Sequence, residues 1–428
     1  MAQPLRLLQR LRGPTGQNLL SLYGVTAANY LFPLLTLPYL ARVLGPSGFG
    51  ALAIVQSLGQ YLSLVVEYGF GLSATREVAR SREDRARLAQ ILAEVLGARL
   101  LLALAVVVLA YALGLFVPAL RANPALFWAG VFWAVALGMS PVWYFQGQER
   151  LRKVVILEVL AKALGVAGIF AFVRSPDEAH RVLLLQGLAA LLSSGVAWGW
   201  AWREVGFILP TPSSALRGLR SGFSLFFFRA AVSLYTSANA FILGLFVPAQ
   251  QVGYYAGAER LTKALLALFE PINRTFLPRL SHLARHNLSQ AARLAQLIVV
   301  SMGLLGLLFG GGVVLLAPLL VHLLLGPGFE PAIPLMRILA LLLPLIAVNL
   351  ALGLQWMVAL GLDRAYNYIT VGAGLLNIGF AIVLVPLFFQ SGMAWAVVSA
   401  EAFVAMALVI YLHHLGKAPW QGGGIAPR

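Results

Sequence analysis

Twelve apolar segments run through the chain, separated by short polar loops. Each is close to the ~20 residues that a helix needs to cross the hydrocarbon core of a bilayer. Stretches such as 183–202 and 298–325 have no polar face, so they cannot lie on the surface of a soluble protein. Hydrophobic residues make up 60% of the chain and charged residues only 11%. The pattern predicts an all-α polytopic membrane protein with twelve transmembrane helices.

Lysine and arginine are distributed unevenly between alternate loops. We place the spans at 18–40, 50–72, 91–113, 125–146, 154–174, 182–201, 221–246, 254–276, 294–317, 332–356, 367–389 and 392–414. The loops on the side that includes both termini hold 20 Lys and Arg residues, and the opposite loops hold 4. Because positive residues stay in the cytoplasm, both termini are predicted to be cytoplasmic.

Composition excludes several classes of function. The net charge of +16 follows from the positive cytoplasmic loops, and no basic run with interleaved aromatic residues indicates a nucleic-acid partner. The chain has no cysteine, which excludes disulfides, thiolate nucleophiles and cysteine-ligated metals. No phosphate-binding glycine loop and no catalytic array of Ser, His and Asp is present. The sequence therefore predicts no enzyme, no metal site and no cofactor.

The chain divides into two halves of six predicted spans each. The predicted lobes are residues 1–210 and 211–428, joined by a polar stretch with two prolines near residues 203–220. A weak repeat appears at an offset of 203 residues, and it pairs Gly50 with Gly253, Gln56 with Glu259, Gln60 with Lys263, Glu67 with Glu270 and Arg76 with Arg279. Since each half has six spans, both would have the same topology in the membrane.

The paired polar residues share helix faces. At 100° per residue, Gln56, Gln60 and Glu67 fall on one face of the second span. A charge in the centre of a span costs about 2.5–3.5 kcal/mol, so a face with several charges does not contact lipid. We expect these faces to line a V-shaped central cavity between the two lobes. Cations outnumber carboxylates within the spans, so the cavity should favour an anion.

Short motifs along the whole chain resemble one family. They are Pro38-Tyr39-Leu40-Ala41-Arg42-Val43-Leu44-Gly45-Pro46, Tyr68-Gly69-Phe70, Ser73-Ala74-Thr75-Arg76-Glu77, Pro141-Val142-Trp143-Tyr144-Phe145-Gln146-Gly147, Tyr235-Thr236-Ser237-Ala238-Asn239, Gly253-Tyr254-Tyr255 and Leu277-Pro278-Arg279-Leu280-Ser281. In this order the motifs resemble the Wzx-type O-antigen and polysaccharide flippases of the multidrug/oligosaccharidyl-lipid/polysaccharide exporter superfamily. One departure is Gly71, where related sequences often carry Asn.

The resemblance implies a flippase of the bacterial inner membrane. Such a transporter would move undecaprenyl-diphosphate-linked oligosaccharide repeat units from the cytoplasmic to the periplasmic leaflet by alternating access. Its implied partners are the lipid-linked oligosaccharide, membrane lipid, a polysaccharide polymerase with its chain-length machinery, and H⁺ or Na⁺ as a coupling ion.

Arginine suits a diphosphate because its planar guanidinium can bond two oxygens at once. We therefore expect substrate contacts from Arg42, Arg229, Arg260, Lys263, Arg274, Gln56, Gln60 and Asn239. Trp143, Tyr144 and Tyr255 could stack on sugar rings, although aromatic residues more often anchor a protein at the membrane interface. Ion coupling requires a carboxyl group within the membrane, and the candidates are Glu67, Glu270 and Glu401.

Two other functions remain open from the sequence. A cation-coupled multidrug exporter of the same superfamily would need an acidic binding lobe, whereas the charges within these spans are mainly basic. A membrane-embedded polysaccharide polymerase or ligase usually needs a large periplasmic loop, and the longest predicted outward loop has only about 14 residues.

Overall fold

The computed structural model describes residues 14–421, without the side chains of 14–30, 221, 224, 225, 227–236 and 274. Every element in this part of the chain is helical. Eight stretches are long and apolar enough to cross a membrane: Leu31–Arg80, Arg85–Phe116, Pro124–Gly147, Leu151–Phe172, Pro176–Val205, Leu288–Leu324, Ala332–Met357 and Asp363–His414. The chain is an all-helical, multi-span membrane protein.

Two of these eight stretches each overlap two predicted spans. The first, Leu31–Arg80, includes the end of the predicted first span and the whole second span, with non-helical backbone at Gly45 and a break after Glu67. The last holds the predicted eleventh and twelfth spans, with non-helical backbone at Phe389. The predicted seventh and eighth spans are helical but are not among the eight stretches. The predicted total of twelve spans stays a prediction.

Internal contacts divide the chain into two compact units, residues 1–241 and 242–428. Unit 1 consists of α2 (Pro14–Glu67), α3 (Phe70–Arg80), α4 (Arg85–Phe116), α5 (Pro118–Arg121), α6 (Pro124–Gly138), α7 (Val142–Gly147), α8 (Leu151–Phe172), η1 (Pro176–Glu178), α9 (Ala179–Val205) and α10 (Pro212–Ser237). Helix α11 (Asn239–Gly244) spans the division. The predicted boundary between two six-helix lobes at residue 210 stays a prediction.

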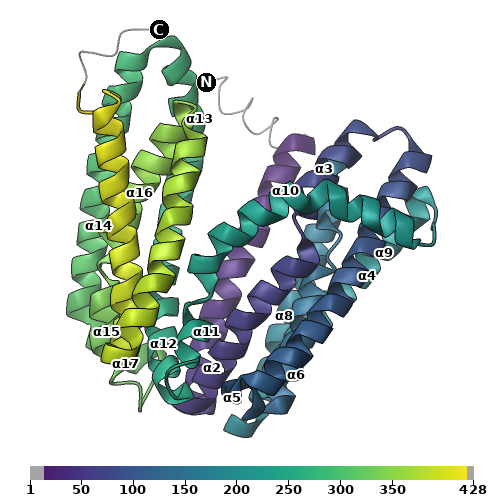
Figure 1. Ribbon diagram of the computed structural model, residues 1–428, viewed down its shortest axis with the longest axis horizontal. Helices are drawn as coiled ribbons and strands as arrows, with labels where there is room; N and C mark the ends of the chain where they lie inside the picture. Colours follow the sequence, from purple (N-terminus) through teal and green to yellow (C-terminus); the bar gives the residue numbers. More distant parts are fainter. Residues whose placement is uncertain (1–13, 422–428) are drawn as a thin grey trace, which may run out of the picture. The chain divides into compact units, whose positions relative to one another are not determined.

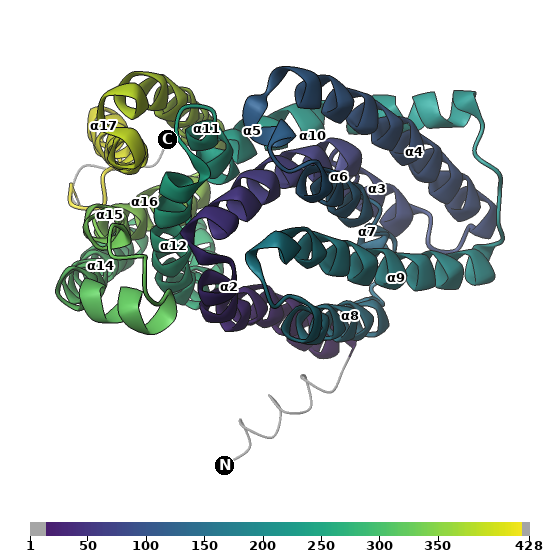
Figure 2. The same ribbon diagram turned by 90° about the horizontal axis from the view of Figure 1, so that it is seen from below.

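Unit 1 is built around four helices that lie side by side. Helix α2 packs against α6 and α8, and α9 packs against the same two helices (Figures 1 and 2). Glycines allow the close approach of α2 and α6. A Cβ atom on Gly130 would lie 2.2 Å from Val55 Cγ1, and one on Gly138 would lie 2.4 Å from Val66 Cβ. Small residues at a helix–helix contact are typical of membrane proteins.

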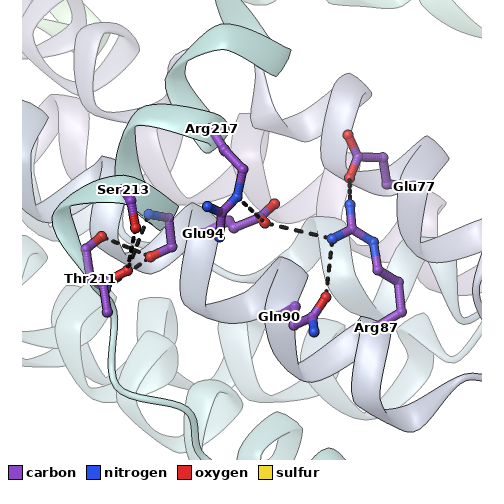
Figure 3. A network of polar contacts seen from close by, with 8 residues as sticks. Glu77, Arg87, Gln90, Glu94, Thr211, Ser213 and Arg217 are labelled. Carbon is purple, nitrogen blue, oxygen red and sulfur yellow. Dashed lines mark hydrogen bonds and ion pairs between the residues drawn. The ribbon is translucent and has the colours of Figure 1, made fainter.

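Helix α10 begins against α4, also in unit 1. A Cβ atom on Gly218 would lie 2.6 Å from the main-chain oxygen of Glu94, so the two helix backbones approach closely there. Ion pairs add to this contact (Figure 3). Arg217 Nε lies 3.1 Å from Glu94 Oε1, and Arg87 Nη1 lies 3.6 Å from the same oxygen. Glu94 therefore joins the beginnings of α4 and α10.

Unit 2 is also helical throughout its described part. Its elements are α12 (Ala249–Leu266), η2 (Ala267–Phe269), α13 (Glu270–His286), α14 (Leu288–Leu324), α15 (Ala332–Leu339), α16 (Leu342–Asn349), the π-helix η3 (Leu350–Met357) and α17 (Asp363–His414). Helix α14 packs against α16. Gly306 allows this close approach, because a Cβ atom at its position would lie 2.6 Å from Pro344 Cα. Helices α15 and α16 both contact α17.

Candidate functional site

Arg99 is a buried cation near the middle of α4, where its side chain is 1% exposed. Its Nη1 donates a 2.6 Å hydrogen bond to the main-chain oxygen of Ser140. Its guanidinium carbon lies 5.8 Å from the centroid of the Phe70 ring, and the Glu67 carboxylate interacts with it electrostatically. A cation in a span costs about 2.5–3.5 kcal/mol without such contacts, so these groups stabilise Arg99 in place.

Arg99 lies beside two helix breaks. The first separates α2 from α3, where Tyr68 and Gly69 have φ angles of 50° and 75°. The second separates α6 from α7 at Ser140 and Pro141. Arg99 contacts a residue next to the first break and the main chain of the second. One side chain of α4 therefore connects two neighbouring interruptions of the helices.

The break between α6 and α7 leaves main-chain oxygens without partners in the helix. The Trp198 indole nitrogen donates a 2.8 Å hydrogen bond to Met139 O, and Arg99 donates to Ser140 O. The Ser140 hydroxyl lies 3.2 Å from Glu158 Oε1. Non-helical backbone within a membrane is tolerated only where such partners replace the lost hydrogen bonds. Side chains of α4 and α9 therefore stabilise this break.

Helix α7 is held at both of its ends by α3 and by the turn that follows α3. Near the beginning of α7, Trp143 O accepts a 3.2 Å hydrogen bond from the hydroxyl of Thr75, in the middle of α3. At the end of α7, Gly147 O accepts a 2.7 Å hydrogen bond from Arg82 Nε, and Arg82 Nη2 lies 2.7 Å from Glu149 Oε1. We call α3 and α7 the paired short helices. Their contacts make them one structural element.

The predicted polar face of the N-terminal half lies on α2. Gln56 is partly buried, with its Nε2 3.5 Å from Gln186 Oε1 on α9, whereas Gln60 is exposed. Ser63 donates a hydrogen bond of 2.8 Å to Gln60 O, and Glu67 is partly buried at the end of the helix. The residues of this face therefore differ in exposure: Gln60 is open to the surroundings, whereas Glu67 is partly buried and interacts with Arg99.

Three further predicted substrate contacts belong to unit 1. Arg42 is exposed on α2. Asn239 is 3% exposed at the beginning of α11, two residues after Ser237, whose main-chain oxygen accepts a 2.5 Å hydrogen bond from Ser57. Arg229 falls in α10, and its side chain lies outside the described residues.

The predicted polar face of the C-terminal half lies on α12 in unit 2. Lys263 Nζ lies 3.0 Å from Glu259 Oε1, and the Tyr255 hydroxyl donates a 3.2 Å hydrogen bond to the same oxygen. The Lys263 side chain is 51% exposed and that of Glu259 is 12% exposed. Arg260 is partly buried beside them. Lys263 thus combines an ion pair with a half-exposed side chain.

The two glutamates matched by the repeat both lie at helix interruptions. Glu67 is the last residue of α2, and Glu270 is the first residue of α13, directly after the 3₁₀ turn η2. Both are partly buried. The other predicted residue of this region, Arg274, has its side chain outside the described residues. The backbone differs at the two positions, because left-handed Tyr68 and Gly69 follow Glu67, whereas helical backbone continues through Glu270.

Glu401 is held by an asparagine of the neighbouring helix. Asn349 Nδ2 donates a 2.7 Å hydrogen bond to Glu401 Oε2 and a 3.1 Å hydrogen bond to Glu401 O. Asn349 is 5% exposed at the end of α16, just before η3. The contact joins α16 to the second half of α17.

A second buried polar contact in unit 2 was missed by the sequence reasoning. Gln355 Nε2 donates a 2.5 Å hydrogen bond to Asn273 Oδ1 and lies 3.5 Å from Met302 Sδ. Gln355 is fully buried and Asn273 is 4% exposed. Gln355 belongs to η3, and π-helices frequently mark functional sites. A glutamine inside an apolar predicted span was the available signal.

The three aromatic residues considered for sugar stacking are buried. Trp143 and Tyr144 are 2% and 0% exposed and belong to the apolar core of unit 1. Trp143 makes an edge contact with Trp198, at 6.2 Å between ring centroids. Tyr255 is also fully buried. In this structure protein covers all three rings, so none of them presents a face to a sugar.

The fold is that of a known class of membrane exporters. The chain is similar to the lipid II flippase MurJ in an inward closed conformation, with a TM-score of 0.72, 12% identity, and coverage of 92% of this chain and 87% of that one. It is also similar to an inward-facing multidrug resistance MATE family transporter of the MOP superfamily, with a TM-score of 0.59, 14% identity, and coverage of 92% and 100%. The fold is therefore the one that these solved membrane transporters share.

Within this class, the chain belongs to the polysaccharide biosynthesis protein family, whose model matches residues 15–284. It is 28% identical to a "Putative O-antigen transporter" of Escherichia coli K12 over 400 residues, covering 93% of this chain and 96% of that protein. A relative of the same name from Shigella dysenteriae is 28% identical, with coverage of 92% and 98%. The resemblance inferred from the motifs is confirmed.

Proposed function

We propose that the protein transports a lipid-linked oligosaccharide across the bacterial inner membrane for the synthesis of a surface polysaccharide. The observation that carries this proposal is the full-length similarity to relatives named as O-antigen transporters. The substrate is an undecaprenyl-diphosphate-linked repeat unit, which passes from the cytoplasmic to the periplasmic leaflet. The polyprenyl tail stays in lipid, while the diphosphate and the glycan cross within the protein.

The proposed architecture has twelve spans in two lobes, residues 1–210 and 211–428, with both termini in the cytoplasm. The lobes alternate in opening a central, net positive cavity to each side of the membrane. The family's fold and the repeat at an offset of 203 residues support this arrangement. A polysaccharide polymerase and its chain-length machinery are the partners that would consume the flipped product.

Cationic side chains would bind the diphosphate. Lys263 is the best supported of these, because its side chain is half-exposed although it pairs with Glu259. Arg42 is exposed as well. The other proposed diphosphate contacts are Arg229, Arg260 and Arg274, and the proposed glycan contacts are Gln56, Gln60 and Asn239.

A proton or sodium gradient would drive transport through a carboxylate. Glu67 is the first candidate, because it is the last residue before the break between α2 and α3 and interacts electrostatically with Arg99. Glu270 and Glu401 are the other candidates. Glu401 is bonded to Asn349, which also suits a purely structural role.

The test uses a bacterial strain whose own O-antigen transporter is deleted and whose glycosyltransferases make the natural repeat unit. The parent chain should restore surface polysaccharide, and Arg229→Ala should reduce it at normal protein abundance. Purified protein in liposomes should move a fluorescent polyprenyl-diphosphate saccharide to the other leaflet. Glu67→Gln should lose the response to an imposed pH or sodium gradient.

The same strains separate this proposal from the two alternatives. A multidrug exporter would raise resistance to cationic drugs without restoring polysaccharide. A polymerase or ligase would extend or transfer repeat units that had already been flipped by another transporter. Either result, without transfer of the fluorescent lipid in liposomes, would overturn the proposal.

A further inference from the structure

The connection between α9 and α10 exposes an unusual run of apolar residues. Residues 206–211 are not helical, and within them Phe207, Ile208 and Leu209 are 56%, 43% and 72% exposed. Gly206 begins the run with a φ of 89°, which turns the chain away from the axis of α9. We call residues 206–211 the connector.

The backbone of the connector needs water. In the described part of the chain, the main-chain groups of Phe207, Ile208 and Leu209 make no hydrogen bond with protein. Unsatisfied main-chain groups are not tolerated in the hydrocarbon core of a bilayer. The side chains, in contrast, are apolar and avoid water. A segment with both properties is most stable at the interface, with its backbone among headgroups and its side chains in the acyl region.

The first turns of α10 continue this amphipathic surface. Leu216 and Phe223 are 49% and 60% exposed, and Arg220 is exposed between them. At 100° per residue the three fall within about 60° on one face of the helix. An arginine between two apolar residues can bury its stem in the acyl region and reach a headgroup with its guanidinium.

Two cations complete the charge of this surface. Arg203 is exposed at the end of α9, and the Arg217 side chain is 60% exposed although it pairs with Glu94. Phe207 packs edge-on against Trp202, with 5.0 Å between ring centroids. Tryptophan is enriched at membrane interfaces, which agrees with this location for the connector.

We propose that the connector and the Leu216–Arg220–Phe223 face form an interfacial anchor that binds the headgroups of anionic phospholipids. The charge of the surface selects the occupant, because Arg203 and Arg220 are cations beside apolar side chains. The headgroup phosphates accept hydrogen bonds from these guanidinium groups. The anchor fixes the beginning of α10 at the membrane surface, while Glu94 fixes it to α4. This inference does not depend on the transported substrate.

The first measurement is the depth of the connector. The natural chain has no cysteine, so a single Ile208→Cys change can carry one environment-sensitive fluorophore without background. The full-length protein is placed in nanodiscs that contain lipids with a quencher at the headgroup or deep in the acyl chain. Leu164→Cys, 72% exposed on α8, is the deep control, and Glu83→Cys in the exposed turn before α4 is the water control.

We expect Ile208→Cys to be quenched most strongly by the shallow quencher, Leu164→Cys by the deep one, and Glu83→Cys by neither. A connector label that behaves like the Glu83 label, in water, overturns the proposal. A label that behaves like the Leu164 label also overturns it, because the connector would then be a lipid-buried loop.

The second measurement tests the choice of lipid. The shallow quencher is attached either to phosphatidylglycerol or to phosphatidylcholine, each present at the same low fraction of the nanodisc lipid. We expect quenching of Ile208→Cys to be about threefold stronger with phosphatidylglycerol. The double change Arg203→Gln and Arg220→Gln should abolish this preference, whereas Arg85→Gln with Lys153→Gln should leave it unchanged.

Equal quenching by both lipids in the parent would remove anionic selectivity and overturn the proposal. If the Arg203→Gln, Arg220→Gln variant still preferred phosphatidylglycerol, other residues would bind the anionic headgroup. That result would also overturn the proposal. The Leu164→Cys label, introduced into each variant, shows through unchanged deep quenching that the variant is folded in the bilayer.

Discussion

The Arg99 guanidinium donates a hydrogen bond of 2.6 Å to the main-chain oxygen of Ser140, which joins α4 to the break between α6 and α7. The Trp198 indole nitrogen satisfies the neighbouring main-chain oxygen of Met139 in the same break. The same guanidinium lies over Phe70 beside the break between α2 and α3. Arg99 is therefore a structural cation rather than a member of a water-filled surface.

Replacing Arg99 by alanine should destabilise the protein. The change leaves Ser140 O without its donor, and removing a charged hydrogen-bond partner costs about 1.5–3 kcal/mol. Thermal unfolding in detergent, monitored by size-exclusion chromatography, should show a lower melting temperature for Arg99→Ala than for the parent. Leu100→Ala, at a residue 51% exposed on the same helix, is the matched control and should have a much smaller effect. Equal stability of the two variants would contradict the assigned role.

Gly392 and Gly379 should respond oppositely to alanine, although both are in α17. A Cβ atom on Gly392 would lie 2.1 Å from the main-chain oxygen of Leu384, which cannot move without shifting the backbone. Gly392→Ala should therefore lower the free energy of unfolding by at least ~1–3 kcal/mol, which is the usual cost of overpacking. Gly379 has no atom within 4 Å of the corresponding position, and Gly379→Ala should raise the stability by up to ~1 kcal/mol through helix propensity.

The buried amide contact between Gln355 and Asn273 should show strong coupling. Gln355→Leu leaves the Asn273 amide without its hydrogen-bond partner, at a cost of about 1–3 kcal/mol. The double variant Asn273→Leu, Gln355→Leu removes both polar groups and should recover part of the loss. A double-mutant cycle on thermal stability measures the coupling. Strictly additive losses would show that the two side chains do not interact.

The ion pair between Arg82 and Glu149 should give a stability that depends on pH. The hydrogen bond and the positive charge from Arg82 hold the pKa of Glu149 below its ordinary value. A carboxylate with a lowered pKa stabilises the folded state above the unfolded pKa, and the stabilisation is lost as the pH falls through the folded pKa. The parent should therefore melt higher than Glu149→Gln near neutral pH. The two melting temperatures should converge below about pH 4.

The all-helical, multi-span character of the chain was predictable because hydrophobic length is a local property of the sequence. The uninterrupted apolar run near 298–325 lies within one helix, α14, as its composition requires. The breaks beside Arg99 were not predicted, since a break inside an apolar run changes its composition very little. Gly69 and Pro141 were the local signals, but either residue can also lie in a continuous span.

The buried polar contacts were less accessible to sequence reasoning. Gln355 and Asn273 are 82 residues apart, so their pairing depends on how η3 and α13 pack. The predicted face on α12 did unite Lys263 with Glu259, because helical spacing alone places these residues four apart on one side. Local geometry was predictable, whereas contacts between distant elements were not.

The fastening of α3 to α7 reduces the number of independent motions in unit 1. Each of these helices follows its own break and could in principle tilt by itself. The Thr75–Trp143 and Arg82–Gly147 hydrogen bonds hold both ends of α7 against α3 and the turn after it, so a rotation at one break imposes a rotation at the other. Two separate hinges thus become a single degree of freedom, and Arg99 contacts both of them.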